Sequence, residues 1–113
     1  MGYRAELEGT AALRVAIEFT AAARSLAVSW APDTASGARC KKLEYARIFL
    51  VALGTEPQRT YLDIVDRHPA TLLHLPEALP AGEYAIEIDA YGSASWGDGR
   101  LDARGRSASF AVV

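Results

Sequence analysis

Alternation of apolar and polar side chains at every second residue is the feature that most constrains this chain. It runs over residues 13–19 and again over 26–30, and its apolar members are Leu13, Val15, Ile17, Phe19, Leu26, Val28 and Trp30. A period of two indicates a β-strand, because successive side chains of a strand point to opposite faces. Helical periodicity is nearly absent, and the alanine run 21–23 is too short to form a stable helix.

Further segments continue the pattern. Residues 45–53 are apolar on both faces, which predicts a strand covered on both sides. Residues 60–65 and 71–75 alternate more weakly, and the first of these places Tyr61, Asp63 and Val65 on one face. The alternation is clearest over 84–90, and the chain closes with a last alternating segment at 108–112.

The alternation also divides the side chains between the core and the surface. Glu83, Glu87 and Asp89 fall on the polar face of segment 84–90, which we expect to be solvated. The predicted core includes the apolar residues Val28, Trp30, Tyr84, Ile86, Ile88 and Phe110.

About seven short strands separated by turns, with no helix between them, predict an all-β fold. The expected architecture is a two-sheet antiparallel β-sandwich. The 113 residues correspond to one domain of this kind, so we expect a single domain over 1–113. Two interpretations remain open for residues 1–11, an extra edge strand or a mobile leader.

Three stretches carry a resemblance to a known family. They are SLAVSW at 25–30, EYARI at 44–48 and LPAGEYAIEIDA at 79–90. In this combination the chain resembles a fibronectin type III-like or immunoglobulin-like β-sandwich domain. The resemblance implies that Trp30 is the core tryptophan of the second strand. It also implies that Tyr84 is a corner tyrosine whose hydroxyl bonds a backbone group a few residues upstream.

Composition and charge exclude several classes of partner. The net charge of −2 and the isoelectric point near 5.6 give no field that would attract nucleic acid or an anionic membrane. The longest apolar run, 48–53, is too short to span a bilayer. No apolar stretch follows a basic start, so we expect no signal peptide. The chain is then either cytoplasmic or part of a longer exported protein, and the second case favours an extracellular or cell-surface location.

No set of residues predicts catalysis. A zinc site needs three or four ligands, and His68 and His74 are the only histidines. Cys40 is the only cysteine, which excludes an internal disulfide; its cationic neighbours favour the thiolate, but no local base accompanies it. Asp98 and Asp102 supply too few oxygens for calcium. We therefore expect no catalytic residue, no metal site and no cofactor.

Residues 91–106, rich in glycine and charge, predict a long loop at one end of the sandwich. Binding loops lie at such ends in related folds, and aromatic and arginine side chains are common anchors of binding surfaces. The candidate contact residues for a protein or carbohydrate are Tyr91, Trp96, Arg100, Arg104 and Arg106.

The expected function is that of a non-catalytic accessory or spacer module of a larger protein, with contacts made through the 91–106 loop. One alternative is a self-associating structural protein that covers the outer apolar face of 45–53 with another chain. The other alternative is a dedicated ligand-binding module that uses Trp96. An enzyme is not expected.

Overall fold

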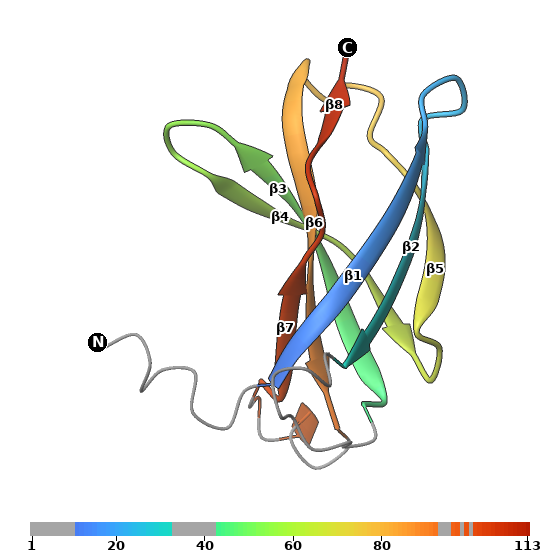
Figure 1. The fold of residues 1–113 in the computed structure, drawn as a ribbon, viewed down its shortest axis with the longest axis vertical. Helices are drawn as coiled ribbons and strands as arrows, with labels where there is room; N and C mark the ends of the chain where they lie inside the picture. The colour runs from blue at the N-terminus through green and yellow to red at the C-terminus, as the bar shows by residue number, and fades with distance from the viewer. Residues whose placement is uncertain (1–10, 33–42, 93–95, 98, 100) are drawn as a thin grey trace.

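The computed structural model describes residues 11–32, 43–92, 96, 97, 99 and 101–113 (Figure 1). These residues form eight strands: β1 (Ala11–Thr20), β2 (Ser25–Pro32), β3 (Tyr45–Leu53), β4 (Gln58–Asp66), β5 (Ala70–His74), β6 (Gly82–Tyr91), β7 (Ala103–Arg106) and β8 (Phe110–Val112). The all-β prediction is confirmed. No helix within the described residues has the length and apolar character needed to cross a membrane.

The strands form one mixed sheet that curls into a nearly closed, barrel-like shape. Its order is β4-β3-β6-β7-β1-β2-β5, and β8 pairs with β6 beyond the end of β7. Every pairing is antiparallel except that of β7 with β1, which is parallel and covers only two residues of each strand. The described strands are thus continuous across this link, whereas the sequence predicted two separate antiparallel sheets.

Gly105 explains why β7 can lie against β1. A Cβ at this position would approach the Leu13 Cβ within 2.7 Å and would also collide with the Leu13 carbonyl. Only glycine, which lacks a Cβ, permits so close an approach of two backbones. The short parallel link between the two parts of the sheet therefore depends on this residue.

The core lies inside the curled sheet, where the apolar side chains of the alternating segments meet. Leu26, Ile48, Ile86 and Ile88 are completely buried, and Val28, Trp30 and Tyr84 are nearly so. Phe110 is partly buried, and its ring centroid lies 5.2 Å from that of Phe19 and 6.3 Å from that of Tyr84.

The Tyr84 hydroxyl lies at the edge of this core and donates a hydrogen bond to the Pro80 carbonyl, four residues upstream, at 2.6 Å. The bond supplies the partner that a buried phenol needs.

A shift in register changes the faces expected for β4. The shift falls between Ile48 and Phe49, so that Tyr61 pairs with Phe49 while Val65 pairs with Ala46. Tyr61 is exposed and Val65 packs against the core, and the prediction that they share a face is wrong. One extra residue in a strand reverses the alternation beyond it.

The predicted loop 91–106 is shorter than expected. Tyr91 is the last residue of β6, and 103–106 form β7. Arg104 and Arg106 therefore lie on a strand, where they alternate with Ala103 and Gly105. Two arginines and a glycine in four residues concealed this strand. Cys40, Asp98 and Arg100 lie outside the described residues.

Candidate functional site

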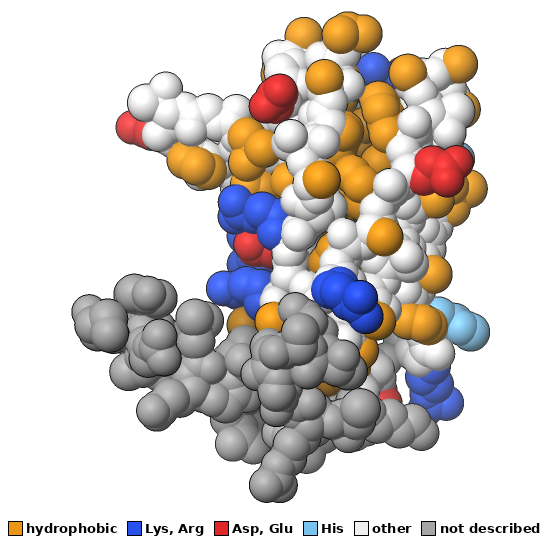
Figure 2. Space-filling model, in the orientation of Figure 1, with side chains coloured by type: hydrophobic (Ala, Val, Ile, Leu, Met, Phe, Trp, Pro, Cys, Tyr) orange, Lys and Arg blue, Asp and Glu red, His pale blue; other side chains and the backbone are white. Residues whose placement is uncertain are grey.

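Charged and aromatic side chains collect on the outer face of β4, β3, β6 and β7, which we call the arginine face. Figure 2 shows basic and acidic side chains side by side there, below the projecting β3–β4 hairpin. Two neighbouring groups make up this face. The ionic ladder consists of Arg59, Glu87, Asp89, Arg104 and Arg106, and the Trp96 cluster consists of Tyr45, Arg47, Tyr91 and Trp96.

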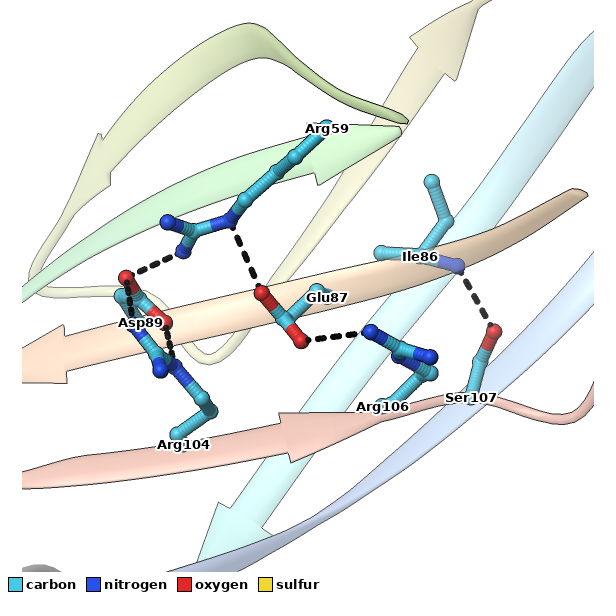
Figure 3. A network of polar contacts seen from close by, with 7 residues as sticks. All are labelled: Arg59, Ile86, Glu87, Asp89, Arg104, Arg106 and Ser107. Carbon is cyan, nitrogen blue, oxygen red and sulfur yellow. Dashed lines mark hydrogen bonds and ion pairs between the residues drawn. The ribbon is translucent and has the colours of Figure 1, made fainter. Parts of the chain in front are cut away.

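The ladder begins with the register of β6 and β7. Asp89 pairs with Arg104, and Glu87, two residues earlier on β6, pairs with Arg106. Arg104 donates two hydrogen bonds to Asp89, from Nε to Oδ1 at 2.7 Å and from Nη2 to Oδ2 at 3.0 Å. Arg106 donates one bond, from Nη2 to Glu87 Oε2 at 3.1 Å (Figure 3). Opposite charges directly across a strand pair stabilise the pairing.

Arg59 of β4 crosses over β3 and joins both carboxylates. Its Nε lies 2.8 Å from Glu87 Oε1, and its Nη2 donates to Asp89 Oδ2 (Figure 3). The guanidinium carbon lies 3.4 Å from the centroid of the Phe49 ring, a cation–π distance. The side chains of the ladder thus link β4 to β6 and β7.

Both carboxylates are buried beneath the arginines. Asp89 is 3% exposed and Glu87 is 8% exposed, so the prediction that they form a solvated face is wrong. The reason is that three long guanidinium side chains lie over them, whereas the alternation records only that the positions are polar.

The charge state of Asp89 follows from the same geometry. Burial raises the pKa of the Asp89 carboxyl, but the hydrogen bonds and positive charges of Arg104 and Arg59 together lower it more. The pKa of Asp89 therefore lies below its ordinary value. The hydrogen bond to Asp89 in turn raises the pKa of Arg104, and the pair is ionised at neutral pH.

The Trp96 cluster lies at the end of β6 beside the ladder. The ring of Trp96 stacks on Tyr45, with centroids 4.9 Å apart and planes inclined by 25°, and meets Tyr91 edge to face at 5.3 Å. The Arg47 guanidinium carbon lies 4.7 Å from the Trp96 centroid. Arg47 itself is exposed, and Trp96 is half-buried. The cluster therefore presents a cation held in place by aromatic rings.

Backbone bonds fix the segment that carries Trp96. The Trp96 N–H donates to the Gly92 carbonyl at 2.8 Å, and the Gly92 N–H donates to Asp102 Oδ2 at 2.8 Å. The Asp102 N–H bonds the Ala90 carbonyl at 3.1 Å. Asp102, one of the two carboxylates considered for calcium, thus accepts a backbone bond that anchors the chain between β6 and β7.

The contact residues expected from the sequence fall into two separate groups. Tyr91 and Trp96 meet in the cluster, but Tyr91 is buried and supports Trp96 from below. Arg104 and Arg106 belong to the ladder rather than to a loop tip.

Sequence reasoning missed Arg47 and Arg59, which reach the face from β3 and β4. Only the strand register brings them there. An arginine on the outward side of each strand was the available signal.

The metal-ligating side chains in the described part of the chain lie apart from one another. No group of three or more histidine, cysteine or carboxylate side chains within it is placed to hold a metal ion. His68 and His74 are both exposed. What the arginine face offers chemically is a set of half-exposed guanidinium donors on a rigid support. Comparison with protein-family models and with the curated proteins found no match for this sequence.

Proposed function

We propose that this domain is a non-catalytic accessory module of a larger protein that contacts a protein partner through the arginine face. The observation that carries the proposal is the pairing of exposed cations with aromatic supports on one sheet face. Arg47 is held over Trp96, while Arg104 and Arg106 keep nearly half of their side-chain surface in water. Tyrosine, tryptophan and arginine are the residues that anchor protein interfaces most often.

The architecture we assign to the module is a fibronectin type III-like or immunoglobulin-like sandwich joined along one edge. In that fold the first, second and fifth strands share one sheet, and the third, sixth and seventh share the other. Here β1, β2 and β5 pair antiparallel in one group, and β3, β6 and β7 do so in another. The bond from the Tyr84 hydroxyl to the Pro80 carbonyl is a second point of support.

The state of the Trp96 ring favours a protein over a carbohydrate. A sugar stacks on a free indole face, but the Trp96 ring already contacts Tyr45, Arg47 and Tyr91. The same contacts hold Arg47 ready for a partner's carboxylate, because little side-chain freedom remains to be lost on binding. The expected partner surface therefore carries aspartate or glutamate next to an apolar side chain.

Selection from a displayed peptide library on the immobilised full chain tests the proposal. We expect enrichment of acidic peptides with an aromatic or aliphatic neighbour. Arg47→Ala and Trp96→Ala should each raise the Kd of a selected peptide about tenfold or more in isothermal titration calorimetry. Arg14→Ala, an exposed arginine on β1 that belongs to neither group of the arginine face, is the matched control and should leave the Kd unchanged.

Circular dichroism of each variant first establishes that it folds. A library that yields no sequence dependent on Arg47 would contradict the contact function and leave the spacer role. A glycan array run in parallel separates the carbohydrate alternative, because binding of a glycan that is lost in Trp96→Ala would assign the face to sugars.

A further inference from the structure

One edge of the sheet carries no acidic residue, lysine or arginine. It is β5, on the right of Figure 1, which pairs with β2 on one side only among the described strands. Its sequence, Ala70–His74, contains no lysine, aspartate, glutamate or proline. Those residues are the usual means by which edge strands avoid pairing with other chains. Leu72, at the centre of the strand, is 63% exposed, the highest value of any large apolar residue within the strands.

The opposite edge of the sheet is protected. β4 carries Arg59, Asp63 and Asp66, and its register shifts opposite Ile48 and Phe49. Charges and a bulge both disfavour the addition of a further strand. The contrast with β5 indicates that the absence of protection there is specific to that edge.

The backbone of β5 offers its hydrogen-bonding groups at alternate residues. The Leu75 N–H donates to the Arg24 carbonyl, and the Pro69 carbonyl accepts from the Trp30 N–H, so the odd-numbered residues turn toward β2. In a strand the next residue faces the other way. The N–H and C=O groups of Ala70, Leu72 and His74 therefore point away from β2, along the open edge.

The strand is also self-complementary about Leu72. In an antiparallel pairing of two copies centred there, Leu72 meets Leu72 of the second copy and Ala70 meets His74. Each of these pairs can exchange two N–H···O=C bonds, since the outward groups belong to the same residues. Arg67 and Glu77, both exposed, lie five residues to either side of Leu72, so the positive end of one copy approaches the negative end of the other.

We infer that β5 is a dimerisation edge, along which two copies of this chain pair antiparallel about a two-fold axis at Leu72 and continue the sheet across both molecules. Isologous pairing of this kind closes after two copies. It goes beyond the proposed function, since it uses another surface and leaves the arginine face open. It also differs from the self-association expected from 45–53, where the outward rings of Phe49 and Tyr45 contact Arg59 and Trp96 of the same chain.

Sedimentation velocity of the full chain tests the inference. Because the edge is short, the interface is small, and we expect a reversible dimer to form between about 10 μM and 1 mM protein. Leu72→Lys places two like charges at the axis and should leave a monomer over the whole range. Ser29→Lys, on the same outer face but on β2, is the matched control and should dimerise like the wild type.

Crosslinking provides an independent readout of the register. In a Cys40→Ser background, Leu72→Cys should form a covalent dimer on mild oxidation, since the Cα atoms of such a pair lie about 5.5 Å apart, within disulfide range. Ser29→Cys in the same background should not. A wild type that stays monomeric at 1 mM overturns the inference. So does a Ser29→Lys variant that loses the dimer as completely as Leu72→Lys, which would indicate stacking of sheet faces instead.

Discussion

The two outer faces of this molecule are built on the same pleated backbone but differ in how their side chains are used. On the arginine face, long side chains cover one another, and even the carboxylates Glu87 and Asp89 are buried. On the outer face of β1, β2 and β5, mostly short side chains line a shallow depression of about 450 Å³, among them the exposed Ala27 and Ser29. Residue length and charge pairing, rather than polarity, therefore decide which outward positions lose contact with water.

An alanine-to-lysine substitution should change the unfolding free energy most on the arginine face and very little on the other face. Ala85→Lys, on β6, introduces a long cation where alanine is 1% exposed, and we expect a loss of about 3 kcal/mol in unfolding free energy. Ala27→Lys, on β2, is expected to change it by less than about 0.5 kcal/mol, because the position faces water. Equilibrium urea denaturation measures both, and similar losses would remove the distinction between the faces.

Removal of the most buried carboxylate comes next. Asp89→Ala leaves Arg59 and Arg104 without their shared acceptor, and we expect a loss of about 2–3 kcal/mol. The estimate stays below that for a fully buried pair, because both arginines retain contact with water. Ser29→Ala, the counterpart on β2, should be neutral within about 0.5 kcal/mol. The same urea titration decides, and a loss below 1 kcal/mol for Asp89→Ala would mean that the ladder contributes little.

The dependence of stability on pH isolates the charge of Asp89. Its pKa in the folded state lies below the unfolded value of about 3.9, so its contribution is complete above that pH and is lost as the pH falls through the folded pKa. Asp89→Asn should therefore lower stability at pH 7 and flatten the decline of stability below about pH 4. Thermal unfolding followed by circular dichroism between pH 2 and 7 tests this, and parallel curves for the two proteins would count against it.

Conservative changes of the two β7 arginines give the smallest effects and resolve the ladder internally. Arg104 makes two bonds to Asp89, whereas Arg106 makes one to Glu87. Lysine cannot reproduce the two-pronged contact, so Arg104→Lys should cost about 1 kcal/mol. Arg106→Lys should cost less than about 0.5 kcal/mol at its half-exposed position. Chemical denaturation in low salt measures the unfolding free energy of both variants. A larger loss for Arg106→Lys than for Arg104→Lys would show that the number of hydrogen bonds does not set the contribution of each arginine.

The part of the fold that could be predicted from the sequence is which face of each strand is buried, because the alternation of apolar residues within the strand indicates it. The alternation of Leu26, Val28 and Trp30 marks the side of β2 that the structure buries, and the same holds for Tyr84, Ile86 and Ile88 on β6. The sequence of a single strand does not indicate which other strand pairs with it, or in which register. The parallel link between β7 and β1 and the register shift in β4 arise from pairing, and neither leaves a periodic signal in the chain.

The site illustrates the same limit. Trp96, Arg104 and Arg106 stood out by residue type, but their partners Arg47 and Arg59 come from strands read earlier in the chain for their apolar residues. The polar residues of β6 were predicted to be solvated, because the neighbouring sequence does not indicate that arginine side chains from other strands will lie over them. Long-range charge pairs become visible only once strands are placed side by side.

The packing around Gly105 bears on how homologues of this domain can be recognised. The position cannot accept a side chain while β7 lies against β1, and its two neighbours must reach the acidic positions of β6. In homologous domains we therefore expect one motif to be conserved even where the rest of the sequence differs. It is Glu-x-Asp followed by Arg-Gly-Arg about fifteen residues later. Distant homologues of this domain can be sought with this short motif rather than by overall sequence identity.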